Sequence, residues 1–407
     1  MTGGSARKTI IALAWAVLAA RASAGQFTDS LDGKLDFSSF LADNAYGFLP
    51  VPIIITEPAL GGFGLGMVGL VFHEDEAART KRMEAARTSD NAARFLLPPS
   101  VSAVAAAYTI NDSWLVGGGH FGFWKEDHIR YRVAAGYGSI NMDFYGTSDF
   151  EFKRPLELET EGLIFYQRLS FRIADSKFLV GLQQSYARLQ VSPNNLRGFI
   201  GDYLPPGLPP GLGDGLADAL TSVIEADDQL SGIGVVAEFD NRDNLFSPRK
   251  GYNYRFEYLW QGGDIGSDYD YSRFTLVGLN YWPVGDRVLT GLRLQADWLE
   301  TDDFLPLYVL PYVNLRGIPA MRYQGDYVAL GEFELTWLLN MRWSVLGFGG
   351  VGRTASAPSE LGSSPNYFSR GVGFRYLIAR RYGMTMGVDV ARGPEDSAFY
   401  ISAGSSW

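Results

Sequence analysis

The feature that most constrains this chain is an alternation of apolar and polar residues with a period of two. From Tyr252 to Trp260 every second residue is aromatic, and Arg255 and Glu257 lie between them. Successive residues of a β-strand point to opposite faces, so the pattern gives one apolar and one charged face. Similar segments recur from about residue 48 to the C-terminus, separated by turn residues. The sequence therefore predicts an all-β protein.

We predict sixteen strands, an even number, as a single-chain bacterial barrel requires. They are Pro50–Glu57, Gly62–Phe72, Pro99–Thr109, Ser113–Trp124, His128–Tyr145, Glu151–Arg172, Lys177–Val191, Gln229–Phe239, Tyr252–Gln261, Tyr269–Trp282, Arg287–Leu299, Asp326–Leu339, Arg342–Arg353, Tyr367–Ala379, Tyr382–Ala391 and Ala398–Trp407. The early strands alternate poorly, and their assignment rests on the strand count and on turn signals.

A soluble β-sandwich would also alternate, so the residues at strand ends decide between the two architectures. Tryptophans near predicted strand ends match the aromatic girdles of a barrel at the two membrane interfaces. They are Trp124, Trp260, Trp282, Trp298, Trp337 and Trp407. Charged residues such as Arg293 and Asp297 would then line a polar lumen. We therefore predict a 16-stranded antiparallel transmembrane β-barrel with a lumen-folded loop and no sizeable soluble domain.

The N-terminus has the organisation of a secretory signal peptide, which we assign to residues 1–24. Arg7 and Lys8 precede an apolar stretch shorter than the roughly 17–25 residues of a spanning helix, and an Ala-Ser-Ala cleavage site follows. Residues 25–47 would form a short periplasmic segment, and residues 48–407 the barrel. These features predict export to the outer membrane of a Gram-negative bacterium.

Composition excludes several classes of function. A net charge of −10 argues against nucleic-acid binding, which needs a basic patch. The chain has no cysteine, and its three histidines, His73, His120 and His128, show no ligand spacing, so we expect no metal site and no cofactor. We find no nucleophile elbow and expect no enzyme. A hydrolase would need a serine within hydrogen-bond reach of His120 or His128.

The predicted connections fall into tight turns and long loops, as in bacterial barrels. Turns such as 340–341 would lie at the periplasmic rim, and the loops 192–229 and 300–325 outside the cell. A helical pattern at Gly215–Ala226 lies inside the first loop. The charged segment from His73 to Pro98 falls on the periplasmic side.

Specific motifs stand in the second half of the chain. Asp240-Asn241-Arg242-Asp243-Asn244, followed by Pro248 and Gly251, favours a defined turn between two strands. Leu315-Arg316-Gly317-Ile318 lies in the loop between the eleventh and twelfth strands. Phe348-Gly349-Gly350-Val351-Gly352 and Gly371-Val372-Gly373-Phe374-Arg375-Tyr376 follow it, and the chain closes with Phe399 to Trp407.

In this order the motifs resemble the BamA/TamA superfamily of outer-membrane assembly and translocation proteins, the bacterial surface antigen family. The resemblance runs from about Phe48 to Trp407 and is strongest after Gln229. In that family the loop arginine folds into the lumen and pairs with acidic groups on the wall, which implies this role for Arg316. A guanidinium in that position needs carboxylate partners, and glycines leave room for a packed loop. The implied partners are Glu332, Glu334, Gly350, Gly371, Gly373 and Arg375.

Three departures from the family pattern qualify the resemblance. Gly350 stands where the family usually has an aspartate, so either Glu334 takes more of that role or the Arg316 lock is weaker. Ile318 replaces the usual aromatic residue of the loop motif. The segment 25–47 is too short for a periplasmic POTRA domain, so the resemblance supports the fold better than the handling of client proteins.

The resemblance implies a role in outer-membrane biogenesis, by insertion or translocation of protein or lipid through a weak seam between the first and last strands. We place that seam at Pro50 and Glu57 on one side and at Phe399 and Trp407 on the other. The alternative is a passive channel or structural surface barrel. Expected partners are phospholipid and lipopolysaccharide, the insertion machinery that would recognise the aromatic C-terminal strand, and a periplasmic protein, but no nucleic acid.

Overall fold

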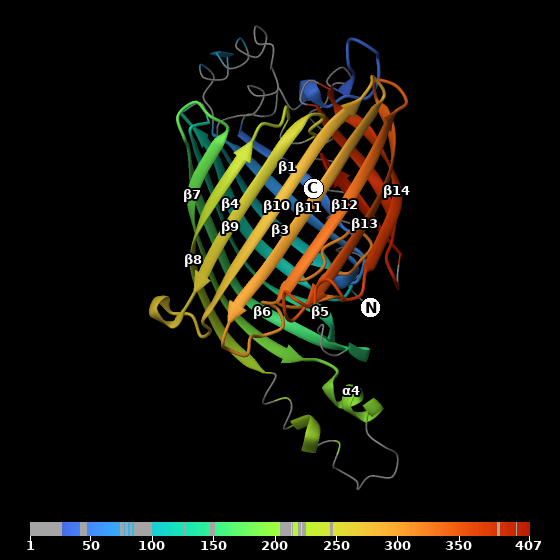
Figure 1. The fold of residues 1–407 in the computed structure, drawn as a ribbon. Coiled ribbons are helices and arrows are strands. Elements are labelled where there is room, and N and C mark those ends of the chain that lie inside the picture. Colours follow the sequence, from blue (N-terminus) through green and yellow to red (C-terminus); the bar gives the residue numbers. More distant parts are fainter. Residues whose placement is uncertain are drawn as a thin grey trace, which may run out of the picture.

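The computed structural model describes residues 27–40 and 47–407, apart from most of 74–99 and the short stretches 126, 147–150, 204–212, 214, 219–220, 222–224, 245–246, 381–382 and 396. Sixteen antiparallel strands follow one another in sequence order and curve around a lumen (Figure 1). The expected signal peptide lies outside the described residues. No helix of the described part is long and apolar enough to cross a membrane.

The predicted barrel and its strand order are confirmed, with most boundaries shifted by one to three residues. The strands are β1 (Gly47–Ile55), β2 (Gly64–Phe72), β3 (Ser100–Thr109), β4 (Trp114–Trp124), β5 (Ile129–Gly146), β6 (Glu151–Arg172), β7 (Phe178–Pro193), β8 (Ala226–Asp240), β9 (Gly251–Gln261), β10 (Tyr271–Val284), β11 (Val288–Thr301), β12 (Tyr327–Leu338), β13 (Trp343–Ala355), β14 (Tyr367–Ala379), β15 (Met384–Arg392) and β16 (Ser397–Ala403).

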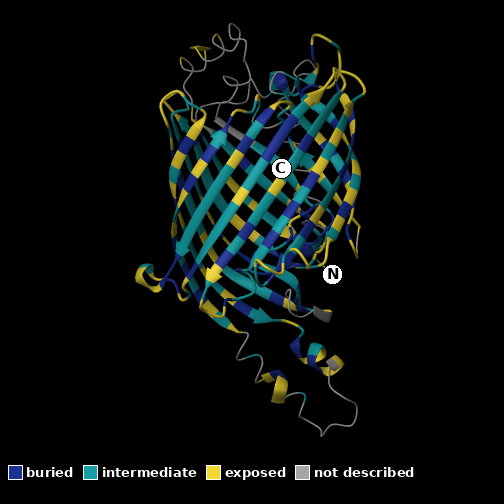
Figure 2. Cartoon of the chain, viewed as in Figure 1, coloured by how far each residue is buried: buried dark blue, intermediate teal, exposed yellow. Residues whose placement is uncertain are grey.

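Cross-strand pairing assigns one face of every strand to the lumen. Glu332 of β12 pairs with Arg293 of β11, and both side chains lie on the lumen face. Because cross-strand partners share a face and successive residues alternate, the ladders identify the lumen-facing residues of every other strand. In β9, Arg255 and Glu257 form an ion pair of 2.5 Å on the lumen side, while Tyr254 is 45% exposed on the outside. Exposed and buried residues alternate along many of the strands (Figure 2). All the tryptophans predicted at strand ends lie on the outer face except Trp407.

The longest strands carry a small domain-like extension at one rim. β5 and β6 span 18 and 22 residues, and with β7 they project beyond the barrel to helix α4 (Leu196–Tyr203) (Figure 1). Leu196 and Ile200 of α4 pack on Phe144, Leu156 and Val191. The sequence did not predict α4. It favoured Gly215–Ala226, of which 215–218 are helical and Ala226 already belongs to β8.

The opposite rim carries the tight turns and binds the N-terminal segment 27–40. Arg342, in the turn between β12 and β13, contacts Asp29 and Asp36 at 2.5 Å and Asp32 at 2.6 Å. Arg380 also contacts Asp29, at 2.5 Å. This hydrogen bond from Arg380 holds the pKa of Asp29 well below its usual value, and the one from Arg342 lowers the pKa of Asp32. We call this group the rim clamp.

The clamp has a defined pH dependence. Carboxylates whose pKa is lowered on folding stabilise the docked state fully above the unfolded pKa of about 3.9, and this stabilisation is lost as the pH falls through the folded values. The segment therefore stays docked at neutral pH and is weakened only in strong acid.

We expect Arg342→Gln to release the N-terminal segment. Without the shared guanidinium, Asp29, Asp32 and Asp36 repel one another across the rim. Hydrogen exchange at residues 29–36 should accelerate roughly tenfold or more, because local opening becomes cheaper. Arg287→Gln, in the neighbouring β10–β11 turn, is the matched control. Equal exchange in both variants would contradict the clamp.

Candidate functional site

The sheet ends at β1 and β16, and these two edges form a seam. In the described residues neither edge has a paired partner strand across the seam, although the two strands lie next to each other. Every other neighbouring pair is joined by an antiparallel ladder. An unpaired edge is a place where a strand, a loop or a ligand can act on the barrel.

The loop between β11 and β12 spans this seam from inside the lumen. The backbone N–H of Gly317 donates to the hydroxyl of Tyr400 on β16, at 2.8 Å. The N–H of Ala320 donates to Oε1 of Glu57, just beyond β1, at 3.2 Å. The same short segment therefore holds both edges, and we call it the seam loop (Leu315–Ala320).

Arg316 anchors the seam loop to the wall of the barrel. Its Nε donates to Oε1 of Glu332 at 2.6 Å, and its Nη2 lies 2.9 Å from Oε2 of Glu334. Its Nη1 donates to Oδ2 of Asp389 at 2.9 Å. The guanidinium lies 3.5 Å from the centroid of the Phe348 ring, and the side chain is 9% exposed. The structure thus places Arg316 in the lumen against both glutamates that the resemblance implied.

Asp389 of β15 is the partner that sequence reasoning missed. Arg375 donates to Asp389 from Nη1 at 2.5 Å and from Nη2 at 2.8 Å. Asp389 lies opposite Gly373 in the ladder. With Gly350 in place of the usual aspartate, Asp389 supplies the third carboxylate around Arg316, so Glu334 does not carry that role alone. The available signal was a single aspartate on the inner face of a strand otherwise rich in Met and Val.

Glycines make the room into which the seam loop packs. A Cβ at Gly350 would lie 2.9 Å from Cδ2 of Leu315, and one at Gly371 would overlap the Phe348 ring beneath Arg316. Gly317 has a φ of +89°, which L-residues rarely adopt. Leu315 and Ile318 are buried in one cluster with Val313 and Tyr323. Ile318 therefore fills an apolar site despite departing from the family pattern.

The C-terminus does not run as predicted. β16 ends at Ala403, Gly404 has a φ of +88°, and the last residues turn into the lumen. The hydroxyl of Tyr281 donates to the carbonyl of Trp407 at 3.3 Å, and their rings lie 5.7 Å apart. The expectation that Trp407 ends the outer face is therefore wrong, because the positive φ at Gly404 breaks the strand. Phe399 remains outside and is 43% exposed.

The inward tail joins the Arg316 cluster through Ser406. Nη1 of Arg316 donates to its hydroxyl at 3.0 Å and Nη2 of Arg375 at 2.8 Å. Ser406 also contacts Glu334 at 3.4 Å. The lumen cluster is thus two guanidiniums, three carboxylates and one hydroxyl, drawn from the seam loop, β12, β14, β15 and the tail.

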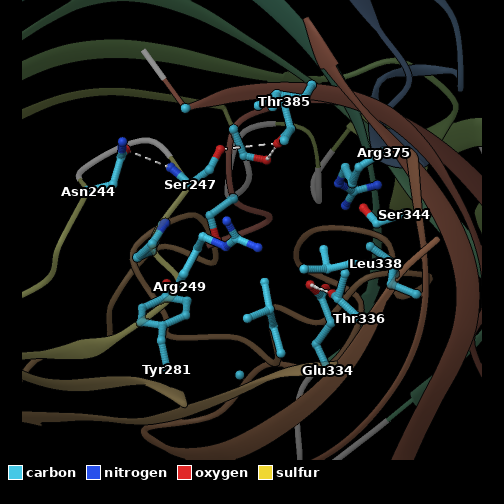
Figure 3. A pocket seen from close by; sticks show the side chains of 18 of the residues that line it. Asn244, Ser247, Arg249, Tyr281, Glu334, Thr336, Leu338, Ser344, Arg375 and Thr385 are labelled. Carbon is cyan, nitrogen blue, oxygen red and sulfur yellow. Dashed lines mark hydrogen bonds between the residues drawn. The ribbon is translucent and has the colours of Figure 1, made fainter. Parts of the chain in front are cut away.

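The predicted turn motif between β8 and β9 closes part of the tight-turn rim. Asn244 accepts from the N–H of Ser247 at 3.0 Å, and the Ser247 hydroxyl lies 3.1 Å from that of Thr385 on β15 (Figure 3). Asp243 accepts from the N–H of Arg249 at 2.9 Å. The other motif residues hold the turn: Asp240 binds Arg242 at 2.9 Å, Gly251 has a φ of +110°, and Pro248 lines the cavity below.

That cavity lies between the turn, the C-terminal tail and the Arg316 cluster. It has a volume of about 1000 Å³, and Tyr281, Glu334, Arg375 and Thr385 are among its lining residues (Figure 3). The lumen therefore keeps an open space next to the cluster at this rim.

The structure places a serine within hydrogen-bond reach of His120. The Ser102 hydroxyl lies 2.9 Å from Nδ1 of His120 and 2.7 Å from Nε2 of His73. Ser102 lies within β3, where its N–H is part of the ladder with Val71. An acyl-transfer site needs N–H groups aimed at the developing oxyanion. The N–H of Ser102 is bonded within the ladder, so any such donor would have to come from another residue.

We expect Gly350→Asp to destabilise the barrel, although it restores the residue usual in the resembling family. The new side chain would meet Leu315 and add a fourth carboxylate beside Glu332, Glu334 and Asp389. The unfolding temperature in detergent should fall by several degrees. Gly350→Ala separates the steric part from the charge. A variant as stable as wild type would contradict this account of the packing.

Comparison with solved structures gives the same fold. BamA from Haemophilus ducreyi lacking POTRA domains 1–3 matches with a TM-score of 0.52 at 11% identity, over 88% of this chain and 69% of that one. CdiB from Acinetobacter baumannii (0.51, 9% identity) and CdiB from Escherichia coli (0.51, 11% identity) each match over 88% of this chain. The match covers 59% and 62% of those two chains. No family profile matches the sequence, and no curated protein sequence does.

Proposed function

We propose that this chain is an outer-membrane barrel that inserts or translocates its substrate through the β1–β16 seam, under control of the seam loop. One observation carries the proposal: the loop binds Tyr400 on one edge and Glu57 on the other, across strands with no ladder between them. BamA and CdiB have barrels of the same fold. Withdrawal of the loop would free both edges at once.

The Arg316 cluster supplies the energetic control. Removing Arg316 leaves Glu332, Glu334 and Asp389 with Arg375 as the remaining guanidinium of the cluster. Breaking a buried ion pair by taking away one partner is strongly unfavourable, because the remaining charges are left uncompensated. The closed seam is therefore held until water or a partner's cation replaces the arginine.

The outer face supports a membrane location. It presents apolar residues with tryptophans near the strand ends, as in transmembrane barrels. We propose contact with phospholipid and lipopolysaccharide, assembly by the outer-membrane insertion machinery, docking of a periplasmic protein at the tight-turn rim, and no enzymatic activity.

The seam proposal is tested by a disulfide. Ile53 of β1 and Ser402 or Ala398 of β16 face the lumen beside the seam, and the chain has no native cysteine. We expect the oxidised double-cysteine protein to reproduce the cellular phenotype of a deletion, and reductant to restore function. Single-cysteine variants are the controls. If the locked barrel supports normal growth and membrane integrity, gating at the seam is wrong.

A passive channel is the second candidate, favoured by the cavity beside the cluster. The seam loop and the C-terminal tail would then act as a plug. Under this reading Arg316→Ala loosens the plug, and single-channel conductance in planar bilayers rises severalfold to a steady open level. Under the first proposal the variant shows at most brief, irregular openings.

A further inference from the structure

The hydrogen bonds between β2 and β3 show which backbone groups of β1 face the seam. The N–H of His73 donates to the carbonyl of Ser100, and that of Ile110 donates to Phe63. Backbone groups alternate between the two sides of a strand, so the odd residues of β2 bond to β3 and its even residues bond to β1. The register pairs those even residues with odd residues of β1. The even residues of β1 therefore direct their backbone groups to the seam.

Two of these even residues are Pro50 and Pro52. Proline has no N–H, so the free edge of β1 lacks a donor at two successive seam positions. Only Phe48 and Ile54 remain as donors on that edge of the strand. Proline in a sheet is normally confined to edges where no partner strand is needed.

The facing edge is intact. The N–H of Gly404 donates to the carbonyl of Thr385, so the even residues of β16 bond to β15 and the odd ones face the seam. Phe399, Ile401 and Ala403 keep their donors there. The shortage of backbone donors at the seam is therefore specific to β1, where two prolines have no N–H.

The lumen wall next to this edge is apolar over four consecutive strands. The lumen-facing side chains described on β1 to β4 carry no charge, whereas β5 begins its inner face with Arg130 and Arg132. The large apolar residues of the wall are Val51, Ile53, Ile55, Val68, Leu70, Val101, Leu115, Phe121 and Phe123. The outer faces of the same strands also expose apolar residues, including Ile54 and Val104. An apolar surface thus continues from the lumen, past the seam, to the outside.

We propose that the seam passes a lipid with long acyl chains, and that β1 does not act as a template for a protein strand. This rests on the proposed seam function and names its substrate. A strand added to β1 would lose two main-chain hydrogen bonds in its middle, which are the main source of affinity in strand addition. Acyl chains need no donors, and an apolar wall keeps them out of water when they leave the bilayer.

The test measures lipid movement in vesicles of phosphatidylethanolamine and phosphatidylglycerol that contain the full chain and a fluorescent phospholipid. Pro50→Val with Pro52→Val supplies both missing donors and should allow β1 and β16 to form a hydrogen-bonded ladder. We expect lipid exchange between leaflets to slow roughly thirtyfold, the effect of two ordinary hydrogen bonds. Pro193→Val, a strand proline of β7, is the matched control and should leave the rate unchanged.

A variant in the opposite sense guards against a folding artefact. Ile401→Pro removes a seam donor of β16 without touching its ladder to β15, and it should accelerate exchange. Wild-type protein that moves lipid no faster than empty vesicles overturns the inference, as do proline variants that exchange lipid at the wild-type rate.

The seam disulfide separates this failure from failure of the function. If it blocks the folding of a barrel client into the vesicles while lipid exchange is unaffected, the seam function stands and the lipid inference falls. If it changes neither process, the seam function itself falls. If it stops lipid exchange, both stand.

Discussion

Closure of the barrel is the constraint on which the rest of the structure depends. A sheet in a membrane must satisfy its backbone groups, and an unpaired N–H in hydrocarbon is expensive. Here no strand ladder makes the last closure: backbone N–H groups of the seam loop donate to the side chains of Tyr400 and Glu57, and Arg316 binds the wall. Pro50 and Pro52 reduce the cost of leaving the edge open, because each removes a donor that would otherwise need a partner.

The Arg316 cluster suits reversible closure because its carboxylates are densely paired around one loop guanidinium. Arg316 and Arg375 share Asp389, and Glu332 and Glu334 depend on Arg316 alone among the ion pairs described for the cluster. Such a group fixes one arrangement of the loop, since moving Arg316 out of its position would leave a buried carboxylate without its cation. The glycines opposite the loop allow the close approach that this arrangement needs.

Local alternation was sufficient for most of the later strands and their faces, because it is a property of neighbouring residues, whereas the early strands were found from the strand count and the turn signals. It placed Arg316, Glu332 and Glu334 through a motif whose order along the chain carried the information. It did not find Asp389, Ser406 or the rim clamp, whose contacts join residues up to 351 positions apart. It extended β16 to Trp407 because the alternation continues, although a single backbone angle at Gly404 redirects the tail. Helix α4 was missed because its stability comes from packing on Phe144 and Leu156.

The poor alternation of the early strands acquires a meaning once the lumen is assigned. A water-filled pore needs a polar lining all round, and most of the strands from β5 to β15 carry charged residues on their inner face. β1 to β4 do not: their inner face is aliphatic and aromatic, and it ends at the edge that carries Pro50 and Pro52. The apolar/polar alternation fails in the strands beside the seam. Sequences depart from such local rules mainly at functional sites, so this departure points to a function of the seam. An apolar wall next to an edge short of donors is poorly suited to ions or to a β-strand, and well suited to an acyl chain.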